Sequence, residues 1–319
     1  MSVLIAALVF SGCGRKGPAE PEITHSVSTP DTPAGPENGH TGESLEYTTG
    51  GSACSRGHSV EYRFGWDDGT MSAWGEEVRT HRFETSGAYA VRAQARCGTK
   101  TGIESDWSGG RNVSITESTT GTMTGNDGKT YATIKIGNQW WMAENLKETR
   151  YRNGDVIPRV TDDSTWNGLF TGARCAYDND ENIAEIYGYL YNGYSVVDGR
   201  NLSPSDWRVP TEADWTKLAD YIGGQLAAGG KMKEAGTIHW KSPNTGATNE
   251  SGFAALPGGF RLLKDGSFGY LGYFAAFWSS TEAFAGYMWS RNLGYDRSAM
   301  FRDDSGRKSG FSVRLVREY

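Results

Sequence analysis

The stretch DWRVPTEADWTKL (residues 206–218) contains the clearest helix signal in this chain. Thr211 is a suitable N-cap, and Asp214 follows three residues later, as in a capping box. Apolar residues then recur at helical spacing: Trp215, Leu218 and Ile222. Gly223 ends the pattern, which therefore predicts one amphipathic helix that begins just after Thr211.

Around this helix, the second half of the chain consists of short strand patterns between Gly-rich turns. Asn126, Asp127 and Gly128 predict a turn between two strands. The stretch GGKMKEAG (residues 229–236) predicts a second, shorter helix. Two helices among many short strands indicate the α+β class.

The composition supports this interpretation and excludes one class of partner. The 319 residues include 43 Gly, 11 Trp and 16 Tyr, which is typical of turn-rich β or α+β domains. The length suffices for two domains with separate cores. The net charge of −6, without an evident basic patch, argues against a nucleic-acid partner.

The N-terminus predicts export. The apolar run over residues 3–10 is too short to span a bilayer but matches the core of a signal peptide. Ser11, Gly12 and Cys13 follow and resemble a bacterial lipobox, in which the cysteine becomes the lipidated first residue. We therefore expect a lipoprotein signal peptide over residues 1–12. Cys13 would anchor an outer-membrane lipoprotein of the bacterial cell envelope, with its domains exposed at the surface. The alternatives are an ordinary secretory signal and a chance apolar start.

Residues 13–42 are rich in Pro, Gly, Ser and Thr, which predicts a tether whose last part is an edge strand. Residues 43–116 alternate as strands do. Their segments YRFGWDDGTMSAW, HRFETSGAYAVRAQAR and SDWSGGRNVSIT resemble, in this order, a PKD/Ig-like β-sandwich. Residues 117–123 predict a polar linker.

The cysteines suggest one disulfide. Cys54 and Cys97 both lie in the predicted sandwich, and export permits disulfide formation, so we expect these two to pair. Cys175 then remains a free thiol.

Six segments of the second domain resemble one known family: GNQWWMAENL, YGYLYN, DWRVPTEADWTKL, HWKSPNTGATNESGFAALPGGFR, FWSSTE and GFSVRLVRE. The family is the Fibrobacter succinogenes major paralogous domain, found in secreted and lipid-anchored bacterial proteins. The resemblance covers residues 124–319 and implies a C-type-lectin-like fold. Many members have a pair of cysteines where this chain has Ser203 and Leu315, and an aromatic residue where it has Ala176.

No catalytic site is predicted. Metalloprotease, nucleophile-elbow and phosphate-loop spacings do not occur in the sequence. Distantly related sulfatase-modifying enzymes use cysteine chemistry, but Cys175 has no partner histidine nearby in the pattern, and His239 stands beside Trp240 as a packing residue would. We expect no enzymatic activity and no cofactor.

No metal site is predicted either. The stretch YDNDEN (residues 177–182) offers oxygen ligands that suit calcium, but its spacing matches no EF-hand loop, so a solvated loop is the favoured interpretation. Several tryptophans could stack on sugars but are expected in the core: Trp140, Trp141, Trp166, Trp207, Trp215, Trp240 and Trp278.

The stretch WSRNLGYDRSAMFRDD (residues 289–304) predicts a hairpin with two unlike faces. A turn at Asp296 and Arg297 pairs three sets of residues on one face: Tyr295 with Ser298, Leu293 with Met300, and Arg291 with Arg302. The other face and the flanking loops share no size, charge or hydrophobicity. Because loops on a rigid scaffold often carry binding residues, we expect a ligand to bind there. The expected site comprises Ala283, Phe284, Ala285, Gly286, Tyr287, Ser290, Asn292, Gly294, Asp296, Arg297, Ala299, Phe301, Asp303, Asp304, Ser305, Gly306, Arg307 and Ser309.

The same segment resembles the variable region of lectin-fold proteins that diversity-generating retroelements target. These elements mutate template adenines, so Asn codons become codons for most residues but never for Trp, Met, Lys, Glu or Gln. Mutation of Asn codons in this way can produce every residue of the irregular second face of the hairpin, and every residue of the flanking loops except Lys308. An ordinary diverged surface hairpin is the alternative.

The leading hypothesis is an adhesin-like, surface-displayed lipoprotein that binds an unknown protein or glycan through its C-terminal face. One alternative is a carbohydrate-binding envelope lipoprotein for polysaccharide use. Another is a structural envelope lipoprotein.

Overall fold

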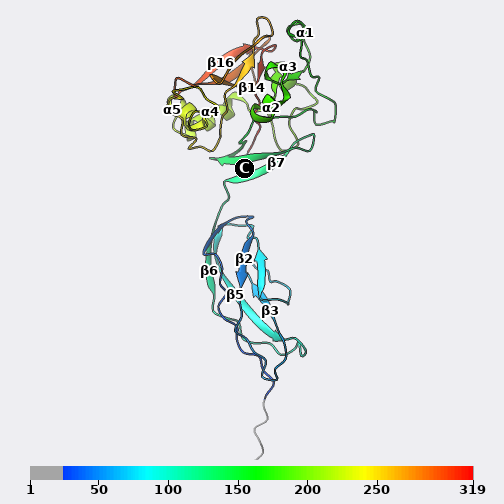
Figure 1. The fold of residues 1–319 in the computed structure, drawn as a ribbon, viewed down its shortest axis with the longest axis vertical. Coiled ribbons are helices and arrows are strands. Elements are labelled where there is room, and N and C mark those ends of the chain that lie inside the picture. The colour runs from blue at the N-terminus through cyan, green and yellow to red at the C-terminus, as the bar shows by residue number, and fades with distance from the viewer. Residues whose placement is uncertain (1–23, 319) are drawn as a thin grey trace, which may run out of the picture. The chain divides into compact units, whose positions relative to one another are not determined.

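The computed structural model describes residues 24–318, and the chain divides into two compact units, Met1–Ser118 and Thr119–Tyr319 (Figure 1). The predicted signal peptide and the predicted lipidation site at Cys13 lie outside the described residues. Among the residues described, no helix has the length and apolar character needed to cross a membrane.

The described part of the first unit contains six strands: β1 (Asn38–His40), β2 (Leu45–Thr48), β3 (Val60–Gly65), β4 (Val78–His81), β5 (Gly87–Cys97) and β6 (Arg111–Thr116). One sheet has the order β1-β6-β5-β3, and β2 pairs with β4 in a second sheet. Alternate residues of β5, such as Val91 and Ala93, are fully buried, as the sequence pattern predicts. They pack with Tyr47, Phe64 and Trp66 in one core.

The described part of the predicted tether belongs to the first unit. Residues 24–34 already pack on the first unit, because Ser28 donates to the Ala53 carbonyl and Ala34 exchanges hydrogen bonds with Thr48. Further along, β1 is an edge strand that pairs with β6 in parallel.

The predicted disulfide is absent. Cys54 and Cys97 are adjacent but free, with their sulfur atoms 3.6 Å apart, against about 2.05 Å in a disulfide. Each sulfur instead has a histidine nitrogen as a neighbour.

The second unit begins with a four-stranded antiparallel sheet of order β18-β9-β8-β7: β18 (Val316–Glu318), β9 (Gln139–Met142), β8 (Thr130–Ile136) and β7 (Thr120–Thr124). Strand β7 occupies most of the predicted linker. It is a strand because its backbone pairs with β8 from Thr120 to Thr124 and because Met123 is buried. The beginning and the end of this unit thus lie in one sheet (Figure 1).

The larger sheet has the order β10-β11-β17-β12-β14-β15-β16, and β13 pairs with β12. Its strands are β10 (Arg174–Cys175), β11 (Leu190–Asn192), β12 (Gly258–Arg261), β13 (Phe268–Leu271), β14 (Phe274–Phe284), β15 (Tyr287–Gly294), β16 (Met300–Gly306) and β17 (Gly310–Phe311).

The helices of this unit are short: α1 (Asp163–Asn167), α2 (Glu181–Tyr187), α3 (Gly193–Val196), α4 (Glu212–Tyr221), α5 (Gln225–Met232) and the 3-10 turn η1 (Tyr177–Asn179). The prediction for α4 is confirmed, including the reciprocal capping box of Thr211 and Asp214. The predicted second helix begins earlier than expected, at Gln225. Position 229, in the interior of this helix, is a glycine because a Cβ there would come within 2.6 Å of the Ala299 carbonyl oxygen. The described chain is therefore mostly β-sheet with few helices.

Candidate functional site

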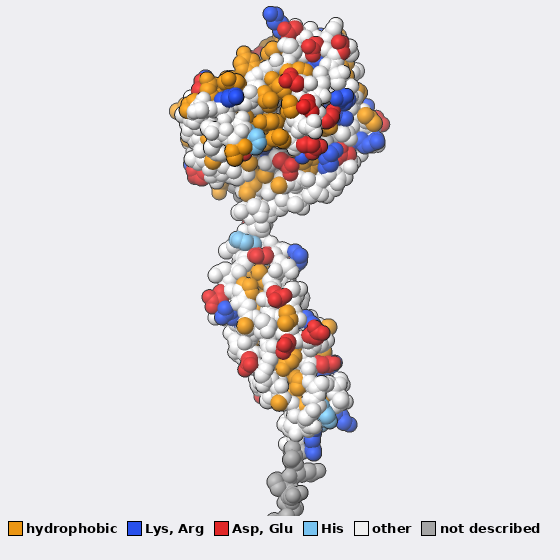
Figure 2. Space-filling model, viewed as in Figure 1, with side chains coloured by type: hydrophobic (Ala, Val, Ile, Leu, Met, Phe, Trp, Pro, Cys, Tyr) orange, Lys and Arg blue, Asp and Glu red, His pale blue; other side chains and the backbone are white. Residues whose placement is uncertain are grey.

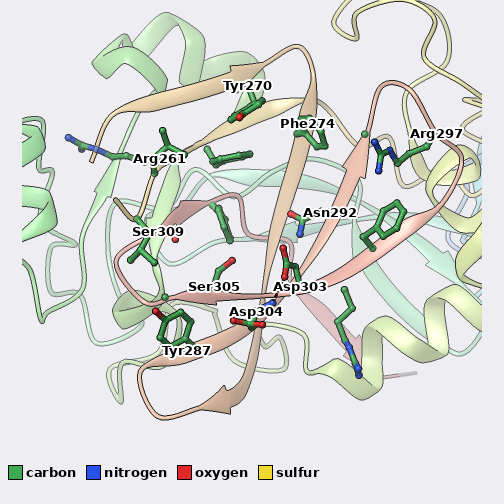
Figure 3. A pocket seen from close by; sticks show the side chains of 18 residues that line it. Arg261, Tyr270, Phe274, Tyr287, Asn292, Arg297, Asp303, Asp304, Ser305 and Ser309 are labelled. Carbon is green, nitrogen blue, oxygen red and sulfur yellow. Dashed lines mark hydrogen bonds between the residues drawn. The ribbon is translucent and has the colours of Figure 1, made fainter. Parts of the chain in front are cut away.

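The β15–β16 hairpin borders a pocket of about 630 Å³, here named the hairpin pocket (Figure 3). The β12–β13 hairpin forms its opposite side. Figure 3 shows Asn292, Asp303 and Ser305 pointing into the space between these two hairpins.

The two faces of the β15–β16 hairpin differ as the sequence predicts. The pairing of Leu293 with Met300 and of Arg291 with Arg302 is confirmed. Leu293 and Met300 are buried in the core that includes α4 and α5. Arg291 is buried on the same face and forms a bidentate ion pair with Glu212, at 2.8 Å for each contact. The opposite face contributes Asn292, Phe301 and Asp303 to the pocket, although its Ser290 is buried, and Arg302 also lines the pocket.

The tip of the hairpin is wider than the predicted two-residue turn. Strand β15 ends at Gly294 and β16 begins at Met300, so Tyr295 and Ser298 do not pair within the ladder. The wider loop follows from contacts of the Lys233 ammonium group. It is buried and donates to three carbonyls around the tip, those of Thr245, Gly294 and Arg297, at 2.9–3.0 Å. Burial lowers the pKa of Lys233 to about 8.

Aromatic rings line the other side of the hairpin pocket. Tyr270 stacks on Phe260 with a centroid distance of 4.9 Å and meets Phe274 edge-on at 5.5 Å. Tyr270 is 51% exposed and Phe301, on β16, is 47% exposed. Exposed aromatic rings that border a pocket offer contact area to a ligand.

The backbone at Tyr270 is strained. Its φ is +68°, a left-handed value that a bulky side chain rarely adopts. Gly259, opposite it in the β12–β13 pair, also has a left-handed φ, of +60°. Strain of this kind is concentrated at functional sites, so Tyr270 is a candidate binding residue.

The polar groups of the pocket come mainly from β16. Asp303 and Asp304 are exposed, and the guanidinium of Arg297 lies over the Phe301 ring at 5.2 Å. Arg261 also borders the pocket, but it is fully buried and its guanidinium pairs with Asp163 at 2.6 Å. A ligand would therefore meet carboxylates, an amide and a guanidinium around an apolar surface.

The structure brings ten of the predicted site residues to the pocket: Tyr287, Asn292, Gly294, Arg297, Phe301, Asp303, Asp304, Ser305, Gly306 and Ser309.

The other eight predicted residues do not line it: Ala283, Phe284, Ala285, Gly286, Ser290, Asp296, Ala299 and Arg307. Phe284 lies at the β14–β15 turn, where it stacks on Tyr287 at 4.5 Å. Ser290 is buried and donates to the Asp303 carbonyl. Asp296 pairs with Arg297, and Arg307 pairs with Glu282.

Eight residues of the lining were missed: Phe260, Arg261, Leu262, Leu263, Tyr270, Phe274, Arg302 and Phe311. Most belong to the stretch FRLLKDGSFGYLGYF (residues 260–274), whose aromatic residues flank a DG turn. That pattern predicts a hairpin but does not indicate which strand the hairpin joins.

The residues considered for catalysis or for metal binding are in environments typical of structural roles. Burial raises the pKa of the Cys175 thiol to about 12, which disfavours the nucleophilic thiolate. His239 lies 2.9 Å from Glu234 and meets the Tyr187 ring edge-on. In the stretch YDNDEN, Asp180 caps α2, and Glu181 pairs with Arg159 at 2.6 Å.

The tryptophans are mostly core residues, as predicted. Of the seven expected in the core of the second domain, six are buried: Trp141, Trp166, Trp207, Trp215, Trp240 and Trp278. Trp140 is half-buried beneath the Arg317 guanidinium. On the face that Figure 2 shows, basic side chains are interspersed with acidic ones on both units.

The solved structures that resemble this chain include two with low TM-scores. A PKD domain of an M14-like peptidase from Thermoplasmatales archaeon SCGC AB-540-F20 is 26% identical, with 28% of this chain and 96% of that chain covered and a TM-score of 0.24. A structure of carbohydrate-binding modules from the β-sandwich superfamily is 13% identical, with 36% and 56% covered and a TM-score of 0.23. Both TM-scores are too low to carry an argument.

No curated protein matches the chain. The model of the Fibrobacter succinogenes major domain family, in contrast, matches residues 134–317, more than half of the chain. This match includes every strand that borders the hairpin pocket. The chain therefore belongs to the Fibrobacter succinogenes major domain family.

Proposed function

We propose that this chain is an adhesin-like lipoprotein of the cell envelope, anchored through Cys13, that binds its ligand in the hairpin pocket. The observation that carries the proposal is the pocket itself. It combines the exposed rings of Tyr270 and Phe301 with the polar side chains of Asn292 and Asp303. Aromatic anchors surrounded by polar groups are typical of binding sites.

The hairpin is suited to this role because it is anchored in the core while Phe301 and Asp303 are exposed. Leu293 and Met300 pack into the core, and Lys233 holds the tip from below. Residues of the pocket face, such as Phe301 and Asp303, can therefore change without loss of the scaffold. This supports binding specificity set by the exposed face.

The proposal is tested by screening the full chain against a printed glycan array and a displayed random-peptide library. Binding that is saturable should fall at least about tenfold in a Phe301→Ala/Asp303→Ala variant, because central contacts dominate binding energy. Phe170→Ala is the matched control, since this exposed ring lies outside the pocket lining.

Three other outcomes are informative. Hits only on the glycan array would assign the pocket to the carbohydrate-binding alternative. Binding that the double variant retains would contradict the pocket as the site. The absence of saturable binding in both formats would support a structural envelope lipoprotein.

We further propose a C-type-lectin-like fold for the second unit, and diversification of the hairpin by a retroelement. The residues of types that such mutation cannot produce have structural contacts instead. Met288 and Met300 are buried, and Trp289 stacks under Arg302 at 4.4 Å. Lys308 lies over the Phe170 ring at 4.5 Å.

Diversification is tested by sequencing the surrounding locus. We expect a near-copy of the region that encodes residues 283–309, rich in Asn codons, beside a reverse-transcriptase gene. A locus without this repeat would contradict diversification and leave the binding proposal to its own test.

A further inference from the structure

Four side chains that commonly bind metals converge in the first unit: His25, Cys54, His58 and Cys97. Their donor atoms all lie within 4.8 Å of one another. His25 Nε2 lies 3.1 Å from Cys54 Sγ, and His58 Nδ1 lies 3.2 Å from Cys97 Sγ. The two sulfur atoms are 3.6 Å apart.

Three separate segments of chain build this cluster. The segment of His25 runs beside that of Cys54, because Ser55 donates to the Ser26 carbonyl and Val27 forms an antiparallel bridge with Cys54. A tight turn then carries the chain from Cys54 to His58.

That turn depends on one glycine. Gly57 donates to the Cys54 carbonyl and has a left-handed φ of +69°, which favours glycine. Beyond the turn, Val60 pairs with Cys97, and Gly98 donates to the Ser59 carbonyl. This register places His58 beside Cys97 at the end of β5.

The spacing of the donors fits a tetrahedral ion. With a Zn–S bond of about 2.3 Å, two thiolates at the tetrahedral angle are about 3.8 Å apart. With a Zn–N bond of about 2.0 Å, a nitrogen and a sulfur are about 3.5 Å apart. Three of the observed separations, 3.6, 3.1 and 3.2 Å, lie within about 0.4 Å of these values, and the remaining donor pairs are no more than 4.8 Å apart.

The chemistry of the cluster also fits a metal better than a disulfide. A disulfide would not require histidine nitrogens beside both sulfur atoms. Both cysteines are buried and both histidines half-buried, so an ion there would be shielded from water. Two thiolates would neutralise a divalent cation, which lowers the cost of burying it.

We propose that His25, Cys54, His58 and Cys97 bind one Zn²⁺ ion in a structural Cys2His2 site. All four coordination positions are filled by protein, so the ion would join three segments and would have no open position for catalysis. Thr99, whose hydroxyl lies 2.8 Å from His58 Nδ1 and 3.5 Å from Cys97 Sγ, would hydrogen-bond to the Cys97 thiolate once His58 binds the ion.

The test is metal loading of the full chain. Protein kept reduced and exposed to Zn²⁺ should retain about one ion per chain after desalting, measured by elemental analysis. Co²⁺ in place of Zn²⁺ should give thiolate-to-cobalt charge-transfer absorption and the visible bands of a tetrahedral site. Zn²⁺ should also raise the melting temperature of the first unit.

Variants of the four residues and one control test which side chains bind the ion. Cys54→Ser/Cys97→Ser should reduce retained zinc to about a tenth or less, and His25→Gln and His58→Gln should each weaken binding at least about tenfold. Because both histidines are half-buried, these single variants should fold. His40→Gln is the control, since His40 lies elsewhere and contacts Thr116.

Two results would overturn the proposal. One is reduced wild-type chain that retains neither Zn²⁺ nor Co²⁺. The other is zinc retention that the cysteine and histidine variants leave unchanged. Intact mass of the unreduced chain adds a third arm: a Cys54–Cys97 disulfide that persists in the presence of Zn²⁺ would restore the pairing expected from the sequence.

Discussion

At the scale of single residues, Arg314 connects distant parts of the second unit. Its guanidinium is fully buried and donates to the Asn145 side chain and to the Met142, Phe253 and Ala254 carbonyls at 2.6–3.0 Å. Burial lowers its pKa to about 9. The charge is tolerated because neutral oxygens replace the water that burial removes.

Replacing this arginine should be costly. We expect Arg314→Met to lower the free energy of unfolding by about 3 kcal/mol or more, because several buried acceptors lose their donor. Urea unfolding measures the change. The control is Arg159→Met, which removes an exposed ion pair with Glu181 and should cost at most about 1 kcal/mol. Equal losses in the two variants would contradict the role given to Arg314.

Glu148 is a buried carboxyl that predicts a pH dependence. Burial, and next the charge of Asp127, raise its pKa from 4.5 to about 7. A carboxyl whose pKa is higher in the folded chain contributes stability that is complete below pH 4.5. That contribution is lost as the pH rises through 7. Between these values Glu148 should therefore make the chain less stable as the pH increases.

Glu148→Gln should flatten this part of the stability profile, because glutamine stays neutral. Urea unfolding of the second unit between pH 4.5 and pH 7.5 measures the slope. Glu185→Gln is the control, since the Glu185 side chain is 76% exposed. A slope unchanged by Glu148→Gln would show that other groups titrate in this range.

At the scale of secondary-structure elements, the β15–β16 hairpin separates stability from binding. Leu293→Ala should cost about 2–5 kcal/mol, because it opens a cavity in the core shared with α4 and α5. Phe301→Ala, on the pocket face, should stay within about 0.5 kcal/mol of wild type. Thermal and urea unfolding of both variants compare the faces. A large loss of stability in Phe301→Ala would contradict this division.

Local sequence patterns predicted the elements whose boundaries and register depend on residues within the element itself. The capping box of Thr211 and Asp214 determines the start of α4, and alternation determines β5 and the hairpin register. The hairpin tip was mispredicted because Lys233, about sixty residues earlier, binds the carbonyls of Gly294 and Arg297. No local pattern contains that contact.

At the scale of the whole molecule, the sequence indicated half of the pocket. The β16 residues were predicted because their unlike side chains contrast with a regular core face. Tyr270 and its neighbours were missed, since their position depends on β12 pairing with both β13 and β14. The zinc-binding cluster was missed for the same reason, because Cys97 is 39 residues beyond His58 in the chain.

The predicted anchor leads to a test of its own. We expect the chain produced in a Gram-negative host to incorporate labelled fatty acid at Cys13 and to fractionate with membranes. Cys13→Ala should lose both properties. Fatty-acid labelling that persists in this variant would contradict lipidation at Cys13.

The central claim is that ligands bind in the hairpin pocket. Hydrogen–deuterium exchange of the full chain, with and without a ligand selected by the wild-type screen, locates binding without any mutation. We expect slower exchange in residues 258–274 and 292–306, on both sides of the pocket. Protection confined to other segments, such as residues 137–146 around Trp140, would contradict it.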